Sequence, residues 1–268
     1  MQSFICVTCG VGHAPSEVPP ERCAICDDER QYVTAAGQRW TTLSELKARH
    51  TIEFKEQEPG LVGIGATPQI AIGQRMLLIR QPGGGILWDC TPLVTDEAVA
   101  RIKELGGVRA MAISHPHFYS SMVDWSEALG GVPIHIHEAN RQYVMRPSER
   151  VNYWSGEALE LGQGVTLVRS GGHFTGSTAL HWTGEDGKGV LMTGDTIMVV
   201  PDTRWVSFMY SYPNLIPLPA REVNRIVGTV EPFAYDRIYS GWWDRVMTHD
   251  AKARVRASAE RYVKAIAG

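Results

Sequence analysis

The 268-residue sequence has no apolar run long enough to cross a membrane. It also lacks an excess of charge of one sign, because 26 Lys and Arg residues stand against 29 Asp and Glu residues. The near balance argues against nucleic acid or an anionic membrane as a partner. The opening residues MQSFICVTCG have neither the basic end nor the long apolar core of a signal peptide. We therefore expect a soluble, cytoplasmic protein.

Cysteine is scarce after the first 26 residues. Four of the five cysteines form two C-x-x-C pairs, Cys6/Cys9 and Cys23/Cys26, and Cys90 stands alone in an apolar stretch. Each pair brings two thiolates together on a tight turn, and in a reducing compartment two such pairs favour a metal over disulfides. The sequence predicts one structural zinc here, with iron as the alternative metal. Cys90 is interpreted as a buried, inert thiol.

The chain changes character along its length. Residues 1–33 hold too little apolar material for a core, so we expect a zinc-ribbon-like module folded by its metal. Residues 34–58 are expected to be a connector, with a short helix in TTLSELKARH, capped by Thr41 or Thr42, and a strand in IEFKEQ. Residues 59–268 are expected to form the main domain.

Strand and helix patterns alternate in the main domain, which predicts a layered α/β sandwich with helices outside two sheets. The predicted strands cover residues 69–73, 75–81, 85–90, 108–114, 132–138, 158–164, 165–172, 178–184, 189–196 and 237–242. The predicted helices cover residues 95–107, with Thr95 as cap, and 120–130, 138–145, 220–231 and 251–266.

Several polar side chains follow predicted strands. His115 and His117 lie in SHPH, His173 in GGH, Asp195 in TGD and Asp89 in WDC. Strand ends that meet at one edge of a sheet bring such residues together. Three imidazoles with an open fourth position make a catalytic zinc site, where zinc lowers the pKa of water to about 7. Asp195 is expected either to be a fourth ligand or to hold the water.

The fragments SHPH, GGHFTGST and TGDT, with the order of strands and helices, resemble the metallo-β-lactamase-fold hydrolase superfamily over residues 50–268. The resemblance implies an αββα sandwich and a catalytic domain over residues 59–268. It also implies that His115, His117 and His173 form the three-histidine metal site. Asp195 matches the carboxylate that bridges or caps the metals, and Asp89 matches a residue that supports the metal-binding loops.

The chain departs from this superfamily at the residues that would bind a second metal ion. The family motif H-x-H-x-D-H reads H-P-H-F-Y-S here, so Tyr119 and Ser120 replace two ligands, and Trp242 occupies the position of the last histidine. Phenol and hydroxyl groups are poor zinc ligands, and indole is only a donor. We therefore expect one catalytic zinc, with Ser120 supporting the turn and Tyr119 donating a hydrogen bond to the substrate. His249 is interpreted as a surface histidine rather than a replacement ligand.

The stretch TRWVSFMYSYPNLIP has no helical period and two prolines, which predicts a loop rich in aromatic residues. This loop has no Arg/Lys cluster, so we expect the substrate to be a small apolar or aromatic electrophile and not a phosphate or nucleic acid. An isothiocyanate is one such substrate, since isothiocyanate hydrolases belong to this superfamily, and lactones, thioesters and β-lactams stay open. The expected pocket residues are Trp205, Phe208, Met209, Tyr210, Trp242 and Phe174.

Other interpretations stay open. If the cysteines bind iron, the chain is a rubredoxin-like redox module on a hydrolase fold. It is alternatively a non-catalytic binding or assembly protein on a degenerate hydrolase fold. The cysteine module is open to three roles: it covers the active site, mediates homodimerisation, or does both. His135 and His137 share one face of a strand, match no metal motif of the superfamily, and are interpreted as structural histidines.

Overall fold

The structure is a computed structural model and describes residues 1–267. The chain divides into two compact units. The first comprises residues 1–136 and 141–153, and the second comprises residues 137–140 and the chain from Trp154 onward. Within residues 1–267, no helix is long and apolar enough to span a membrane.

The first unit is built on a seven-stranded sheet in the order β3-β4-β5-β6-β7-β8-β9. Strands β3 to β6 form an antiparallel meander, and β7 and β8 join in parallel. Strands β5 and β6 are buried throughout, which fits their continuous apolar sequence. The strands are β3 (Thr51–Glu58), β4 (Leu61–Thr67), β5 (Arg75–Ile79), β6 (Gly85–Trp88), β7 (Val108–Ala112), β8 (Ile134–His137) and β9 (Val151–Trp154).

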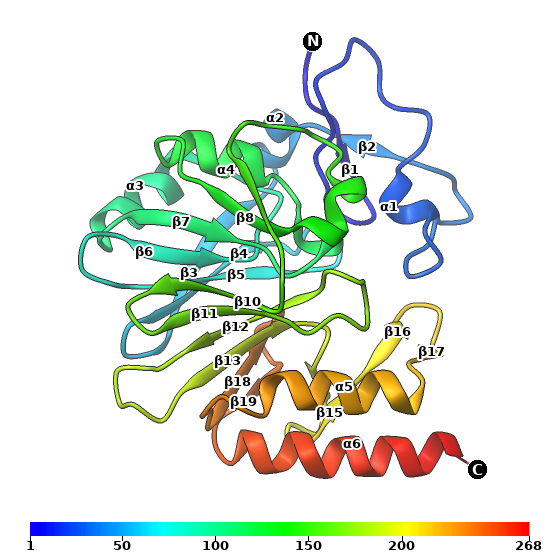
Figure 1. Cartoon of the computed structure of the whole chain (residues 1–268). Coiled ribbons are helices and arrows are strands. Elements are labelled where there is room, and N and C mark those ends of the chain that lie inside the picture. Colours follow the sequence, from blue (N-terminus) through cyan, green and yellow to red (C-terminus); the bar gives the residue numbers. More distant parts are fainter. Residues whose placement is uncertain (268) are drawn as a thin grey trace. The chain divides into compact units, whose positions relative to one another are not determined.

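Helices α3 (Asp96–Glu104) and α4 (Met122–Ala128) lie along one face of this sheet (Figure 1). The predicted cap of α3 is confirmed, because the Ala98 amide donates to the Thr95 hydroxyl at 3.1 Å. The predicted connector helix is also confirmed as α2 (Leu43–Lys47), where Thr42 and Glu45 form a capping box. Two 3₁₀ turns complete the set, η1 (Pro116–Phe118) and η2 (Glu138–Tyr143).

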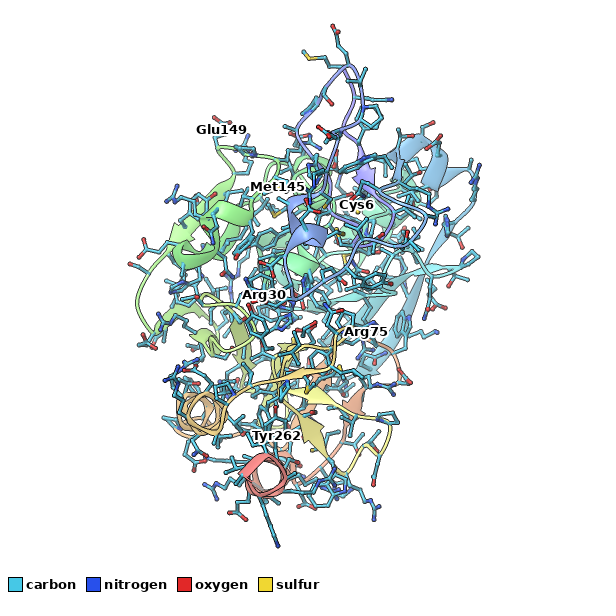
Figure 2. The ribbon with its side chains drawn as sticks, turned by 90° about the vertical axis from the view of Figure 1, so that its right-hand side faces the viewer. Cys6, Arg30, Arg75, Met145, Glu149 and Tyr262 are labelled. Atoms are coloured by element: carbon cyan, nitrogen blue, oxygen red, sulfur yellow. The ribbon has the colours of Figure 1, made fainter. Side chains whose placement is uncertain are left out.

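The cysteine-rich start of the chain is part of the first unit. Its elements are short: β1 (Ile5–Cys6), α1 (Ala24–Asp27) and β2 (Trp40–Thr41), with β1 antiparallel to β2. Ile5 packs in a small apolar cluster with Leu46, Ala66, Ile70 and Leu93. The Ala14 amide donates to the Met145 carbonyl at 3.1 Å, and Figure 2 shows Cys6 and Met145 in the same part of the unit.

The second unit has a six-stranded sheet in the order β10-β11-β12-β13-β18-β19. Helices α5 (Ala220–Val230) and α6 (Ala251–Ala267) cover one face of it (Figure 1). Their buried faces share one hydrophobic core with Leu191 of β13 and Ile238 of β18. The strands are β10 (Ala158–Gly162), β11 (Val165–Arg169), β12 (Thr178–Trp182), β13 (Val190–Gly194), β14 (Met198–Val199), β15 (Val206–Ser207), β16 (Met209–Ser211), β17 (Ile216–Pro217), β18 (Arg237–Ser240) and β19 (Val246–Met247).

Three local predictions were wrong, and two strands were not predicted. Residues 69–73 form a loop instead of a strand, because Ala71 and Gly73 have positive φ angles of 53° and 73°. Strands β4 and β9 were not predicted, and the glycines of LVGIGAT resemble a turn although β4 is fully paired. The helix predicted at 138–145 is the 3₁₀ turn η2. The predicted loop at 203–217 contains the short strands β15, β16 and β17.

Burial lowers the pKa of three histidines, His135, His137 and His181, because the fold disfavours their charged form. A histidine whose folded pKa lies below its unfolded value of about 6.5 stabilises the fold above that pH and loses this contribution as the pH falls. His181 illustrates the case, since its buried Nε2 lies 2.7 Å from the Ala234 carbonyl.

We expect the free energy of unfolding to fall between about pH 7.5 and 5.5, and to fall less in the variant His181→Gln, which keeps a donor but cannot be charged. Urea unfolding at each pH measures this difference. The matched control is His249→Gln at an exposed histidine. Equal pH slopes for wild type and His181→Gln would contradict the expectation.

Candidate metal centre

The first pair of candidate ligands lies on the turn after β7. His115 precedes the 3₁₀ turn η1, and Pro116 fixes the start of that turn. The His115 and His117 rings are both buried, with centroids 5.2 Å apart. The Ser114 hydroxyl lies 3.1 Å from His115 Nδ1, at hydrogen-bond distance. The turn therefore presents two buried imidazoles close together.

Asp89 lies behind this turn. Its carboxylate accepts a hydrogen bond from the Ser114 amide at 2.8 Å, and the residue is buried directly after β6 with φ +60°. A non-glycine residue in the left-handed region is uncommon and is held by its surroundings. This contact fixes the backbone immediately before His115, which is the kind of support that the resemblance implied for Asp89.

The second pair lies in the second unit. His173 follows β11, and Asp195 follows β13. His173 Nε2 lies 3.7 Å from an Asp195 carboxylate oxygen, and both side chains are almost fully buried. Burial raises the pKa of the Asp195 carboxyl, and the neighbouring His173 opposes part of that rise. An imidazole and a carboxylate are thus brought together without solvent.

Backbone carbonyls and one phenol hold this second pair. His173 Nδ1 lies 3.2 Å from the Met209 carbonyl, so that its Nε2 is the nitrogen facing Asp195. The Tyr212 hydroxyl donates to the Asp195 carbonyl at 2.8 Å. Sequence reasoning placed Tyr212 among the aromatic residues of the loop and gave Met209 a side-chain role, but it predicted neither of these two contacts. No motif signals a contact made through a main-chain oxygen.

His115, His117, His173 and Asp195 together form a buried group that could hold a metal ion, since one ligand atom from each lies within 4.8 Å of the others. Three neutral imidazoles and one carboxylate are ligands that zinc accepts. The donor set therefore fits the metal that the sequence implied.

Tyr119 and Ser120 lie two and three residues after His117, where the superfamily motif has metal ligands. Tyr119 is 1% exposed, and Ser120 is buried with φ +40°. The Ser120 carbonyl accepts from the Gly12 amide at 2.9 Å, and its hydroxyl accepts from Gln74 Nε2 at 2.9 Å. Ser120 thus contacts the cysteine-rich part of the chain.

Phe208, Tyr210 and Trp205 were expected to line the pocket. Phe208 is fully buried in the core of the second unit, where its ring meets Tyr262 of α6 edge-on, with centroids 5.9 Å apart. Tyr210 packs against the same core, and the Trp205 ring lies under the Arg261 guanidinium at 4.2 Å. These three side chains therefore pack against the core of the second unit and against α6.

The other three expected pocket residues are Phe174, Met209 and Trp242. Phe174 is buried, and its ring centroid lies 5.0 Å from that of His173 in an edge-on contact. Met209 and Trp242 are half-buried. Among the sequence-predicted pocket residues, Phe174 thus makes a direct ring contact with a candidate ligand inside the second unit.

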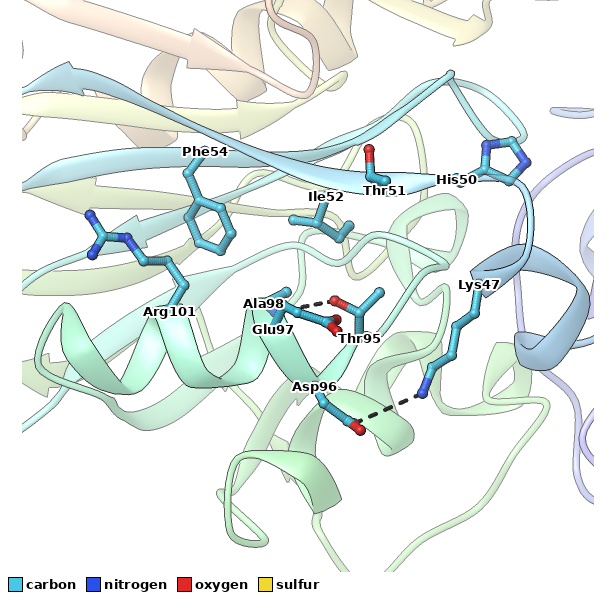
Figure 3. A pocket seen from close by; sticks show the side chains of 10 residues that line it. All are labelled: Lys47, His50, Thr51, Ile52, Phe54, Thr95, Asp96, Glu97, Ala98 and Arg101. Atoms are coloured by element: carbon cyan, nitrogen blue, oxygen red, sulfur yellow. Dashed lines mark hydrogen bonds and ion pairs between the residues drawn. The ribbon is translucent and has the colours of Figure 1, made fainter.

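A pocket of about 650 Å³ lies elsewhere in the first unit (Figure 3). Ile52 and Phe54 of β3 face Ala98 of α3 across it, and Lys47 and Arg101 stand at its ends. None of the sequence-predicted site residues lines it.

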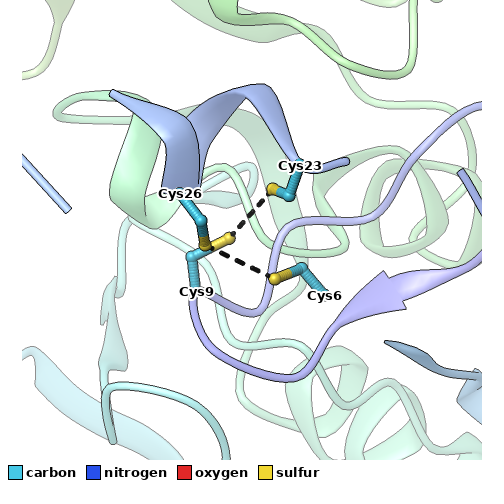
Figure 4. A group of neighbouring side chains, drawn as sticks. All are labelled: Cys6, Cys9, Cys23 and Cys26. Carbon is cyan, nitrogen blue, oxygen red and sulfur yellow. Dashed lines mark hydrogen bonds between the residues drawn. The ribbon is translucent and has the colours of Figure 1, made fainter. Parts of the chain in front are cut away.

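The four N-terminal cysteines form a second buried group with ligand atoms within 4.8 Å of one another (Figure 4). The Sγ atoms of Cys6 and Cys26 are 3.5 Å apart, and those of Cys9 and Cys23 are 3.7 Å apart. These distances exceed a disulfide bond of about 2.05 Å. They approach the separation of about 3.8 Å expected for thiolates arranged tetrahedrally at 2.3 Å from zinc. Gln38 also donates to Cys6 Sγ at 3.1 Å.

The two sheets, their helices and the buried histidine group define a protein with the metallo-β-lactamase fold. VMB-1 superposes with a TM-score of 0.60 at 12% identity, over 81% of this chain and 98% of that one. The metallo-β-lactamase FIM-1 from Pseudomonas aeruginosa, solved in a mono-zinc form, superposes with a TM-score of 0.56 at 14% identity, over 78% and 95% of the two chains. The resemblance seen in the sequence is confirmed for the fold.

A relative lies much nearer in sequence. The chain is 46% identical over 269 residues to YmaE, an uncharacterized protein of Bacillus subtilis (strain 168), covering 99% of this chain and 97% of YmaE. The chain therefore belongs to the same family as YmaE. No protein-family model matches the sequence.

Proposed function

We propose that this protein is a metal-dependent hydrolase with one catalytic metal ion held by His115, His117, His173 and Asp195. The observation that carries the proposal is the buried group of four ligand atoms within 4.8 Å of one another, on a metallo-β-lactamase fold. Zinc bound to such a donor set lowers the pKa of a coordinated water to about 7 and polarises the substrate.

The chain's own residues prepare this site. The Met209 carbonyl at His173 Nδ1 and the Ser114 hydroxyl at His115 Nδ1 occupy the second nitrogen of each ring. Such contacts fix the tautomer and orientation of an imidazole, which leaves Nε2 for the metal. Asp195, buried beside His173, either completes the ligand set or accepts a proton from water. Tyr119, which follows the histidine turn, is proposed to donate a hydrogen bond to the substrate.

A single ion is proposed because the positions of a second one carry the wrong side chains. Tyr119 and Ser120 follow His117 where the superfamily has Asp and His, and Trp242 stands where it has a final His. Ser120 directs its hydroxyl to Gln74, which occupies it as an acceptor. FIM-1 has been solved in a mono-zinc form, so a chain of this fold is known with one zinc.

The proposed substrate is a small, apolar or aromatic electrophile, such as an isothiocyanate, with lactones, thioesters and β-lactams as the other classes. Phe174 supports this proposal through its edge-on contact with His173. Trp242, which is half-buried, is proposed to supply a further aromatic surface, because it stands where the superfamily motif has its final histidine. Trp205, Phe208 and Tyr210 do not contribute support, since they contact the second unit's core and α6.

Metal analysis of the purified protein tests the proposal. We expect two zinc ions per chain, one at the cysteines and one at the histidine group, and hydrolysis of at least one substrate class in a panel of isothiocyanates, lactones, thioesters and β-lactams. Mass spectrometry counts the metals, and absorbance assays follow the substrates. Three ions per chain would contradict the single catalytic metal. Full zinc occupancy without turnover across the panel would favour a binding protein on this fold.

A further inference from the structure

The turn that follows His117 is hydrogen-bonded to the cysteine module, residues 1–33. The Gly12 amide donates to the Ser120 carbonyl at 2.9 Å. Ser120 lies three residues after His117 and has φ +40°, a conformation that a serine seldom adopts without being held. The module therefore makes a backbone hydrogen bond to the segment that carries two candidate metal ligands.

Gln74 makes the second connection. Its side chain is 2% exposed, and its amide nitrogen donates to the Ser120 hydroxyl at 2.9 Å and toward the Cys9 carbonyl at 3.4 Å. One buried amide therefore contacts both a cysteine of the four-thiol group and the histidine turn. The loop that carries Gln74 is not itself part of either ligand set.

Close packing around Gln74 leaves the neighbouring side chains and backbone little room to move. Gly10, next to Cys9, has φ +81°, and a Cβ at this position would lie 2.6 Å from Pro92 Cγ and 3.2 Å from Gln74 Nε2. Pro92 in turn accepts a hydrogen bond from the Ser121 hydroxyl at 2.7 Å. The C-x-x-C turn, Gln74 and the segment after His117 are thus in mutual contact, so a shift in one displaces the others.

We propose that Gln74 is a positioning residue that holds the histidine turn against the four-cysteine module and thereby raises the metal affinity of the histidine site. The proposal rests on the proposed function only in that the histidine group binds a metal. When a residue that orients a metal-binding side chain is replaced, the metal affinity changes by about 10- to 100-fold. Gln74 does not contact a ligand side chain but acts through the backbone that bears His117. We therefore expect a change in metal affinity at the lower end of that range.

The test is zinc retention in wild type and Gln74→Met, which keeps the length of the side chain but removes the amide donor. Each protein, as purified with its zinc, is dialysed against buffers of graded free zinc, and zinc per chain is counted by mass spectrometry. We expect Gln74→Met to lose one zinc at about tenfold higher free zinc than wild type and to keep the other. The zinc lost is assigned to the histidine site by its absence from His117→Ala.

The matched control is Gln69→Met, on the same loop but exposed, which is expected to retain zinc as wild type does. If Gln74→Met does not fold, Gln74→Leu replaces it, because leucine also removes the amide donor from this buried position. Unchanged retention in the folded variant overturns the proposal, and so does an equal loss at both sites. A wild-type protein without a zinc that depends on His117 would instead refute the proposed function.

Discussion

The variant His117→Ala is expected to lose one of two zinc ions and to lower kcat/KM for the best substrate by at least about 10³-fold, or about 4 kcal/mol of transition-state stabilisation. His117 is buried and is one of four side chains whose ligand atoms lie within 4.8 Å of one another. Its removal leaves two imidazoles and one carboxylate, one ligand fewer than the predicted donor set. Metal analysis and steady-state kinetics on the same preparation measure both effects.

The control for this variant is His249→Ala. His249 is exposed and contacts Asp250 at 2.8 Å, far along the sequence from the histidine turn. It is also the residue that would have to act if the chain replaced a missing family ligand. We expect two zinc ions and wild-type kinetics in His249→Ala. Full turnover in His117→Ala, with or without its zinc, would end the hydrolase proposal in its present form.

The sequence identified the candidate ligands because each follows a strand that its own residues predict. Strands β7, β11 and β13 are predominantly apolar, and they end three, four and one residues before His115, His173 and Asp195, respectively. Strand periodicity fixes where such a run stops, so the first polar residues beyond it fall at the sheet edge. The Thr42 and Thr95 caps were predictable for a similar reason, since capping chemistry is local.

The parts of the fold and of the site that the sequence did not predict depend on contacts between segments that are distant in the sequence. Phe208 and Tyr210 were expected in a pocket wall because β15 and β16, beside or around them, have only two or three residues, which is too short for alternation to show which side faces the core. The support of His173 comes from a main-chain oxygen, which any residue at position 209 would supply. Gln74 has no sequence signal, since its importance arises only when Cys9 and Ser120 meet it in the fold.

Replacing one cysteine of the four-thiol group is expected to have the second large effect. We expect Cys23→Ser to lose the module's metal and to lower the melting temperature by about 10 °C or more, because metal binding supplies folding free energy that a short segment lacks. Hydrogen bonds from the Cys26 and Cys6 thiols already lower the pKa of the Cys23 thiol, which favours the thiolate that a metal needs. Thermal unfolding and metal analysis measure the two changes.

Cys90→Ser is the matched control, because Cys90 is also fully buried but lies outside the four-cysteine group, and its thiol donates to the neighbouring Thr91 carbonyl. Its replacement is expected to cost about 1–2 kcal/mol without loss of metal. The same samples distinguish zinc from iron, since iron–thiolate protein is red and zinc protein is colourless. A Cys23→Ser protein as stable as Cys90→Ser would mean that the thiols bind no structural metal. The contacts of Gly12 and Gln74 with Ser120 would then hold the histidine turn unaided.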